Sequence, residues 1–502
     1  MTEQNTGTQS NTFSEQEIIR RQKLSELIQQ GKDPYSIARY EVTASAEEIL
    51  SDFERFEGKT VGIAGRVVSR RVMGKAAFAH MLDGSGDIQL YVKRDDIGQD
   101  SYADFKNGDL GDVVGVKGHV FRTKSGEVSV HAQEVVLLCK CLKPLPEKWH
   151  GLTDADLRYR QRYLDMIVNP QVRETFLKRS RIITAIRSFM DARGFLEVDT
   201  PILHTLEIGA AARPFQTHHN TLDIDMYLRV ETELYLKRLI VGGFEKVYEI
   251  GRIFRNEGMD TRHNPEFTSI ELYQAYVDYH EMMDLVEALF GQIAREVCGG
   301  ETINYQGQQI YLQAPWTRMT MAESVKRYAD VDWESWLSDE EARSCLDERH
   351  VHYEKGATRG DCLVLLFDEY VEKNLVQPTF IIDYPVENSP LAKRKADNPH
   401  LTERFELFIC ASEYGNAFSE LNDPIDQKER FVRQVQERRA LGGKNARVDE
   451  DFVNALEYGL PPTGGMGIGV DRMIMLLTDS ASIRDVLLFP TMKPAEIDQA
   501  KG

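Results

Sequence analysis

A glycine-rich run near the C-terminal end constrains the fold of this chain more than any other feature. Residues 465–469 carry a glycine at every second position, and an apolar stretch follows at residues 473–477. This pattern predicts a strand that passes into a helix, at a join where the backbone and Arg472 can approach a ligand closely. Taken alone the run is weak evidence, because alternating glycines often mark only a tight backbone approach.

A second stretch, Phe254-Arg255-Asn256-Glu257, closes a strand-like apolar run at residues 247–253. Residues 262–267 follow and offer an arginine for phosphate, an aromatic ring for base stacking and a nearby carboxylate. An arginine two residues before a glutamate is common on exposed strands, so this stretch is also weak by itself. Together the two stretches indicate a nucleotide site.

A long helix and a strand precede both stretches. Apolar residues recur at three- and four-residue spacing over 171–193, and Gly194 is typical of a helix C-terminus. Residues 195–201 then alternate like a strand and close on Pro201. In this order, the three segments resemble the signature motifs of class II aminoacyl-tRNA synthetases. Their order favours that family over an ordinary α/β core with coincidental glycines and arginines.

Length, composition and charge limit the classes of protein to which this chain can belong. The 502 residues suffice for two or three domains, and no apolar run has the length of a transmembrane helix, so no membrane partner is expected. Six scattered cysteines without Cys-x-x-Cys spacing indicate free thiols and a cytoplasmic protein. The net charge of −19, from 61 basic and 80 acidic residues, argues against a polyanion partner unless local basic clusters bind it. The polar residues 1–13 are expected to form a disordered tail.

The N-terminal part carries the pattern of a helix followed by a small β-barrel. Ser14 and Glu17 form the capping box of a helix that ends before Gly31. Five strand-like runs lie between residues 60 and 138, with a hairpin turn at 83–86. They predict a closed barrel of the OB type, a fold that binds single-stranded nucleic acid, although a protein-interaction module also fits the pattern.

Over residues 14–495 the chain resembles the bacterial-type lysyl-tRNA synthetases. The aspartyl and asparaginyl enzymes share the barrel and the three motifs, but not the specific stretches that carry this resemblance. Those stretches are residues 71–76, 158–165, 210–215, 233–239, 262–268 and 416–424.

The resemblance implies an α+β fold with an N-terminal OB-type barrel and a class II catalytic domain. The catalytic domain would contain an antiparallel sheet flanked by helices and a helical insertion at about 277–376, and residues 389–393 would form a mobile loop near the site. The implied boundaries are a helical segment at 14–58, the anticodon-binding barrel at 59–146, a linker at 147–165 and the catalytic domain at 166–502.

The implied activity is ATP-dependent activation of L-lysine, followed by transfer of lysine to the 3′ end of tRNA(Lys), by a homodimer with Mg²⁺ as cofactor. In-line attack on phosphorus needs positioning and charge neutralisation, so no nucleophilic side chain is expected. The resemblance makes Arg255 and Arg472 catalytic, with Arg255 bridging the α-phosphate and the substrate carboxylate. The implied ATP-binding residues are Arg255, Glu257, His263, Asn264, Phe267, Glu406 and Arg472.

Glu406 and Glu413 would hold Mg²⁺ by resemblance, a role that suits carboxylate oxygens. From the residues alone, a structural ion pair or a solvated face would be preferred for both.

Lysine selection would rest on Glu233, Tyr273 and Glu420, two carboxylates and a phenol around an ammonium group. An aspartate-specific relative should present cationic groups there instead. The other implied lysine-binding residues are Gly209 and Glu271 at the α-amino end, and Asn416 and Phe418 along the slot.

In the barrel, the resemblance implies that Phe78 stacks on an anticodon base and that Arg71, Gln89 and Glu127 read base edges. From the residues alone, Phe78 between two alanines fits a position in the barrel core as well.

Three positions depart from the family pattern. Ile208 replaces a glycine before Gly209, and Ser412 replaces an arginine beside the proposed metal site. If residues 230–236 form a strand, Glu231 and Glu233 share a face, and Glu231 adds a carboxylate to the ammonium pocket. An outward ion pair of Glu231 is the simpler interpretation.

Two other functions fit the same scaffold. A ligase that attaches a lysine-like amino acid to a protein is disfavoured by the intact barrel with Phe78. An inactive paralogue that only binds nucleic acid is disfavoured by Arg255, Arg472, Glu406 and Glu413.

Overall fold

The fold is that of a computed structural model, which describes residues 13–146, 152–206, 212–440 and 447–494, without the side chains of 437–440. The chain divides into two compact units, Met1–Thr153 and Asp154–Gly502. Each unit has its own hydrophobic core.

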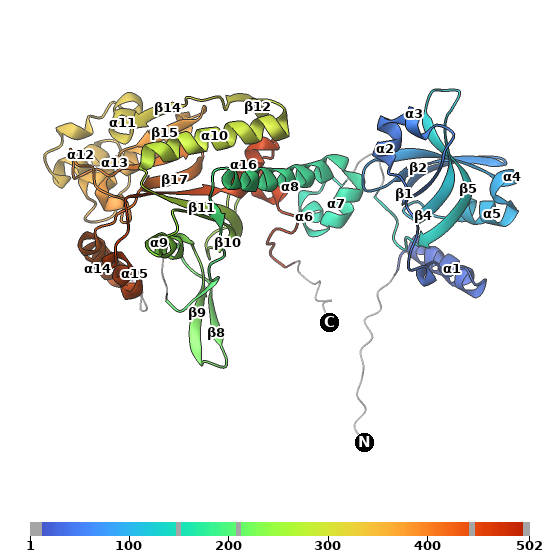
Figure 1. Ribbon diagram of the computed structural model, residues 1–502, viewed down its shortest axis with the longest axis horizontal. Helices are drawn as coiled ribbons and strands as arrows, with labels where there is room; N and C mark the ends of the chain where they lie inside the picture. Colours follow the sequence, from blue (N-terminus) through green and yellow to red (C-terminus); the bar gives the residue numbers. More distant parts are fainter. Residues whose placement is uncertain (1–12, 147–151, 207–211, 441–446, 495–502) are drawn as a thin grey trace, which may run out of the picture. The chain divides into compact units, whose positions relative to one another are not determined.

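The N-terminal unit is a five-stranded barrel with short helices (Figure 1). The strands pair in the order β1-β2-β3-β5-β4 and close into a barrel, so the predicted OB-type barrel is confirmed. The strands are β1 (Thr60–Met73), β2 (Ala76–Leu82), β3 (Asp87–Lys93), β4 (Val113–Arg122) and β5 (Val128–Cys139). The helices are α1 (Glu15–Gln29), α2 (Ala46–Ser51), α3 (Phe53–Phe56), α4 (Arg94–Ile97) and α5 (Gln99–Asn107), with a 3-10 turn at Pro34–Ser36.

Strand alternation separates the barrel interior from its outer surface. In β2 the buried residues Ala77, Ala79 and Met81 alternate with half-buried ones, and Phe78 is among the latter. Because successive side chains of a strand point to opposite faces, Phe78 lies on the outer face. The interpretation of Phe78 as a barrel core residue is therefore wrong.

The C-terminal unit begins with helices α6 (Ala155–Arg160), α7 (Arg162–Val168) and α8 (Pro170–Asp191). Arg162 is fully buried and donates to Asp165 Oδ2 at 2.7 Å and to the carbonyl oxygen of Arg484 at 2.7 Å. The segment predicted as a linker over 147–165 is therefore helical from Ala155 onward. Arg162 belongs to a buried ion-pair network within this segment.

An eight-stranded sheet forms the centre of the C-terminal unit, in the order β14-β15-β16-β17-β18-β11-β10-β6. Pairing is antiparallel from β15 to β10, whereas the edge strands β14 and β6 pair in parallel. The sheet is mixed, which corrects the predicted antiparallel sheet at its two edges. The strands are β6 (Leu196–Glu197), β10 (Lys246–Phe254), β11 (Glu266–Ala275), β14 (Thr317–Thr320), β15 (Thr379–Ile382), β16 (Arg404–Phe408), β17 (Glu413–Ser419) and β18 (Thr463–Gly469).

The strand predicted over 195–201 is reduced to the two residues of β6. The backbone N–H of Thr200 donates to Glu249 Oε2 at 3.1 Å and leaves the strand ladder. Pro201, the next residue, has no N–H to donate.

Alternating residues of the central strands face two layers of helices. Tyr248 and Leu272 belong to the core that includes residues of α8, α10 (Tyr279–Cys298) and α16 (Val470–Leu477). Val247 and Tyr273 belong to a second core with α9 (Glu233–Val241) and α15 (Glu450–Glu457). The two layers of helices cover opposite faces of the sheet. The helix predicted over 171–193 is present as α8, and the strand and helix predicted at the glycine-rich run are present as β18 and α16.

Part of the segment predicted as a helical insertion, 277–376, belongs to the main core, because α10 packs there. Another core includes Trp333, Leu346 and Phe367 together with Ile381 and Phe408 of the central sheet. The helices that contribute to it form a separate helical part: α11 (Met321–Ala329), α12 (Asp339–Glu348) and α13 (Arg359–Tyr370). The remaining elements are the strands β7 (Leu203–His204), β8 (Gln216–His219), β9 (Ile224–Leu228), β12 (Thr302–Tyr305) and β13 (Gln308–Tyr311), and the helices α14 (Pro424–Ala440) and α17 (Ile483–Val486).

Residues 389–393 are tied into the structure instead of forming a free loop. Arg430 Nη1 donates to the carbonyl oxygens of Ser389 at 3.0 Å and Ala392 at 2.9 Å. The backbone N–H of Lys393 donates to the carbonyl oxygen of Ser419 at 2.8 Å. The expectation of a mobile loop is replaced by a segment held at three points.

Candidate active site

A cavity of about 370 Å³ opens on the α9 face of the sheet, over β11, β17 and β18. Glu406 and Glu420 do not line it, and Gly209 and Ile208 lie outside the described residues. The predicted residues that do line it are Glu233, Arg255, Glu257, His263, Asn264, Phe267, Glu271, Tyr273, Glu413, Asn416, Phe418 and Arg472.

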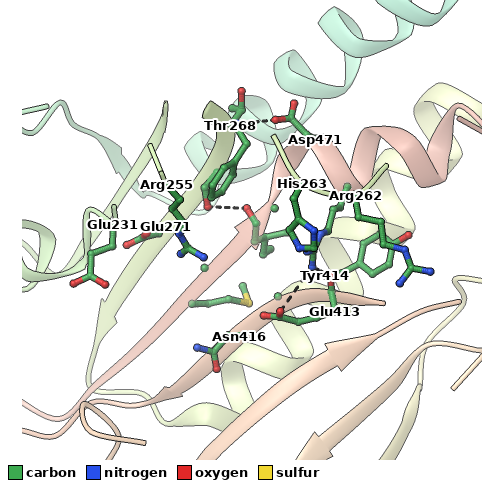
Figure 2. A pocket seen from close by; sticks show the side chains of 18 of the residues that line it. Glu231, Arg255, Arg262, His263, Thr268, Glu271, Glu413, Tyr414, Asn416 and Asp471 are labelled. Carbon is green, nitrogen blue, oxygen red and sulfur yellow. Dashed lines mark hydrogen bonds and ion pairs between the residues drawn. The ribbon is translucent and has the colours of Figure 1, made fainter. Parts of the chain in front are cut away.

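The cavity has a cationic end and an anionic end. Figure 2 shows Arg262 and His263 toward one end, Glu231 and Glu271 at the other, and Arg255 between them. Arg255 Nε has no hydrogen-bond partner among the described residues, and the guanidinium carbon lies 5.4 Å from the centre of the Phe267 ring. A guanidinium donor without a protein acceptor suits an anionic ligand.

Arg472 is oriented by contacts on two sides. Its Nη1 donates to the backbone carbonyl of Glu413 at 2.5 Å, and its Nη2 lies 3.1 Å from His263 Nε2. His263 Nδ1 contacts the Asp260 carboxylate at 2.8 Å, and this hydrogen bond lowers the pKa of Asp260 to about 2. The imidazole and the guanidinium are therefore held side by side at the cationic end.

Asn264 and Glu257 hold the segment between β10 and β11. Asn264 is buried and donates from Nδ2 to the carbonyl oxygen of Glu266 at 2.7 Å. Glu257 Oε1 accepts from the backbone N–H of Arg213 at 3.3 Å. Both side chains line the cavity and shape its wall.

An ion pair that sequence reasoning missed ties the three motif segments together. Arg179 on α8 donates to Asp471 Oδ1 at 2.5 Å and to Thr268 Oγ1 at 3.2 Å. Asp471 Oδ2 accepts from the backbone N–H of Thr268 at 2.7 Å. Asp471 adjoins Arg472 and Thr268 adjoins Phe267, so this bridge fixes the backbone beside two side chains that line the cavity.

At the anionic end, burial disfavours the charged form of the Glu271 carboxylate. Burial raises the pKa of Glu271 to about 7, and the nearby charge of Glu233 adds to this effect. Burial also raises the pKa of Tyr273, so the phenol stays neutral. Uncompensated negative charge in a half-buried cavity favours a cationic ligand.

Glu231 and Glu233 do not share a strand face, so that prediction is wrong. The backbone turns at Thr232, and Glu233 is the first residue of α9. The buried residues Leu236, Lys237 and Ile240 recur at helical spacing, which a strand would divide between its two faces. Both glutamates nevertheless line the cavity.

Lys237, which sequence reasoning also missed, lies behind the anionic end. It is fully buried, donates to Glu233 Oε1 at 2.5 Å and forms an ion pair with Glu420 Oε2. Apart from this pair, the buried Glu420 carboxylate has no hydrogen-bond partner among the described residues. The sequence pattern that could have revealed this ion pair is the four-residue spacing of Glu233 and Lys237 at the start of a helix.

Glu406 lies in a neighbouring cavity of about 350 Å³ that Glu413, Arg262 and Arg472 also line. Its Oε1 accepts from Arg404 Nη2 at 2.5 Å, and its Oε2 from the Tyr384 hydroxyl at 2.9 Å. Burial raises the pKa of Glu406 to about 7 against the opposing charge of Arg404, and the charge of Glu413 adds to the rise.

Two carboxylates that repel each other fit a divalent cation, which would relieve the repulsion. No group of three or more His, Cys, Asp or Glu with metal-ligand geometry occurs among the residues that the structure describes. A cation held by Glu406 and Glu413 would therefore need further ligands from a substrate.

On the barrel, the predicted reading residues border a row of rings. Phe78 faces Tyr91 with ring centres 5.0 Å apart, and Tyr91 faces His131 at 4.9 Å. Gln89 Nε2 donates to Glu127 Oε2 at 2.6 Å. Arg71 is exposed and pairs with Phe78 across β1 and β2.

The row continues beyond the predicted residues. The rings of His119 and His131 lie 4.6 Å apart, and those of Phe121 and His131 lie 5.8 Å apart. The sequence pattern that could have revealed these rings is their alternation with aliphatic residues along β3, β4 and β5. Because the aliphatic residues point inward, the rings lie on the outer face.

Comparison with known families decides the assignment. Residues 154–493 match the family of class II tRNA synthetases for D, K and N, and residues 61–138 match the OB-fold nucleic acid binding domain. A lysine–tRNA ligase of Thermoanaerobacter pseudethanolicus is 58% identical over 476 residues, 95% of each chain. The lysine–tRNA ligase of Clostridium tetani is 56% identical over 495 residues, which cover 98% of this chain and 99% of the relative.

The chain belongs to the lysine–tRNA ligase family, within the class II synthetases.

Membership in the lysine–tRNA ligase family confirms the resemblance seen in the sequence, including the barrel and the catalytic fold. It leaves the individual roles of the site residues as predictions. In the described residues, no helix combines the length and apolarity needed to cross a bilayer.

Proposed function

We propose that this protein activates L-lysine with ATP to lysyl-adenylate and transfers the lysine to the 3′ end of tRNA(Lys). The observation that carries the proposal is the polarity of the cavity: arginines at one end suit the phosphates of ATP, and carboxylates at the other suit the ammonium groups of lysine. The relatives named lysine–tRNA ligases support the same activity.

Arg255 lies where both reactants would meet. We assign it the α-phosphate and the lysine carboxylate, because its guanidinium stands between the two ends of the cavity. Phe267 and Arg472 would hold the adenine, with Glu257, His263 and Asn264 around the nucleotide. Attack of the carboxylate oxygen on the α-phosphorus then releases diphosphate and needs charge stabilisation in place of a protein nucleophile.

Glu406 and Glu413 would hold Mg²⁺ together with the ATP phosphates. The ion would neutralise phosphate charge. Ser412 in place of an arginine leaves Arg262, Arg404 and Arg472 as the arginines that line the cavity containing Glu406 and Glu413.

The slot for lysine would use Glu233, Tyr273 and Glu420 for the side-chain ammonium group. Glu271, with the backbone of Gly209, would bind the α-amino group, and Asn416 and Phe418 would line the path between. Discrimination against a neutral isostere would reach about 2–5 kcal/mol, the cost of leaving a buried charge unpaired.

The barrel would bind the anticodon of tRNA(Lys). We assign stacking to Phe78 and base-edge reading to Arg71, Gln89 and Glu127, and the row of rings beside Phe78 supports a single-stranded ligand. One stacked base contributes about 1–3 kcal/mol.

We further propose a homodimer in the cytoplasm. Large apolar side chains are exposed on α8, on β6 and on the segments beside them, where the sheet also has its two-residue edge strand. These side chains are Leu177, Leu196, Ile202, Leu203 and Phe244. All six cysteines are free, as in a reducing compartment.

The test is ATP–diphosphate exchange with each standard amino acid, followed by charging of tRNA(Lys). We expect exchange with lysine alone. Phe78→Ala should leave exchange unchanged and lower kcat/KM for tRNA charging about tenfold or more, the effect of losing a stacking contact. Exchange without any tRNA charging would indicate a ligase for another acceptor, and no exchange with any amino acid would indicate a protein that only binds nucleic acid.

A further inference from the structure

The closed end of the amino-acid cavity is built from alternating charges. Glu233 lines the cavity with its side chain 13% exposed, while Lys237 and Glu420 are fully buried behind it. The Lys237 ammonium group contacts both carboxylates. The three groups therefore form an ion triad in which Lys237 contacts both carboxylates, and its Glu420 end lies in the protein interior.

Lys237 is fixed in this position by its surroundings. Its ammonium nitrogen lies 5.5 Å from the centre of the Phe418 ring and 5.8 Å from that of Phe452. Burial lowers the pKa of Lys237, but the charges of Glu233 and Glu420 outweigh burial and raise it, so the group stays protonated. Rings and carboxylates on several sides leave the ammonium group no route to water.

Without Lys237, the two carboxylates would face each other in a buried site. Burial and the charges of Glu233 and Glu271 already raise the pKa of Glu420, and the charge of Lys237 opposes this. Removal of the cation would therefore raise the pKa of Glu420 further and favour its protonated form. The charge that the cavity presents depends on Lys237.

We propose that Lys237 is a positioning residue of the lysine site: it holds Glu233 and Glu420 together and leaves the triad with one uncompensated negative charge. One substrate ammonium group neutralises that charge. The inference rests on the proposed function, because it takes lysine as the ligand. It also explains why a fully buried lysine stands behind a cavity that selects a cation.

The triad makes a non-additive prediction. Glu420→Gln leaves Lys237 and Glu233 with no net charge, so a substrate ammonium group finds no uncompensated negative charge to pair with. Lys237→Met/Glu420→Gln restores a single negative charge on Glu233. In Lys237→Met alone, Glu420 takes up a proton, so this variant should resemble the double variant.

The experiment measures the Kd of L-lysine by calorimetry for the wild-type chain and the three variants. We expect the double variant to bind lysine at least tenfold more tightly than Glu420→Gln, and within about threefold of Lys237→Met. A purely structural Lys237 gives the opposite order, with the double variant binding no better than Glu420→Gln, and this result would overturn the inference. Arg238→Met is the matched control, because it removes a cation and the ion pair with Asp449 from the same helix.

A second measurement covers the case in which the methionine variants do not fold. Glu420→Gln should bind L-norleucine, the uncharged analogue, as well as it binds lysine. A remaining preference for lysine of more than tenfold contradicts the inference. If the wild-type chain binds no lysine, the proposed function fails and the inference with it; lysine binding with the wrong order of variants rejects the inference alone.

Discussion

Gly465 shows how closely a single residue is fitted at the anionic end. A Cβ atom at this position would lie 2.0 Å from Glu420 Oε1 and 2.5 Å from Tyr273 Cε1, both of them too short. We predict that Gly465→Ala displaces both side chains and raises KM for lysine about tenfold or more, since overpacking costs about 1–3 kcal/mol. KM for ATP should stay within about threefold. The measurement is ATP–diphosphate exchange at varied lysine and ATP.

Gly300→Ala is the control for this change, since a Cβ there meets no atom within 4 Å. Equal effects on both Michaelis constants in Gly465→Ala would contradict the assignment of Tyr273 and Glu420 to lysine.

We predict that Glu271 makes lysine binding depend on pH. Its pKa, raised to about 7 by burial and by Glu233, lies above the ordinary value of 4.5. Between these two values the folded chain binds more protons than the unfolded chain, so the ligand-free protein loses stability as pH rises from about 4.5 to 7. An ammonium group favours the carboxylate, so lysine should release a proton and bind more tightly as pH rises from 6 to 8, by up to about tenfold per unit below the pKa.

Calorimetry of lysine binding in buffers of different ionisation enthalpy measures this proton release. Glu271→Gln should abolish both the release and the pH dependence of lysine affinity between 6 and 8. An unchanged pH profile in this variant would assign the effect to another group.

At the scale of elements, α8 is coupled to the cationic end of the cavity through Arg179. The ion pair with Asp471 is largely buried, with the two side chains 13% and 3% exposed. Removal of one partner from a buried pair costs about 3–5 kcal/mol. We predict that Arg179→Met lowers the melting temperature by several degrees and raises KM for ATP more than KM for lysine, because β11 and α16 lose their common anchor.

Arg187→Met on the same helix provides the comparison. Its ion pair with Glu197 is exposed, 46% and 37%, so its loss should cost about 1 kcal/mol or less. If Arg179→Met changed stability without any selective effect on ATP, the bridge would serve the fold alone.

At the scale of the whole molecule, the exposed apolar side chains of α8 and β6 favour a dimer. Leu196 is 45% exposed on the edge strand of the sheet, and Leu177 is 56% exposed on the neighbouring helix. We predict that Leu177→Glu with Leu196→Glu yields a monomer with reduced activity, because two charges cannot be desolvated in an interface. Light scattering gives the mass, and Leu337→Glu, at an 87% exposed position on the separate helical part, should leave it unchanged.

A wild-type monomer in solution would contradict the proposed assembly. A dimer that survives both charged substitutions would place the interface on another surface.

Local patterns were enough to predict much of this protein. The capping box of Ser14 and Glu17, the hairpin turn at 83–86 and the passage from β18 into α16 are encoded by neighbouring residues, and all three are present. The motif residues Arg255 and Arg472 line one cavity, as their order in the chain indicated. Short-range hydrogen bonds and strand or helix periodicity carry that information.

The tertiary structure alone decided which charges are buried and what they face. Arg162 lies in a segment predicted as a linker but is buried, and Lys237 is a helix residue whose partner Glu420 lies far along the chain. Thr200 leaves its strand because Glu249 accepts its N–H. Desolvation and pairing depend on segments distant in sequence, and no local pattern encodes them.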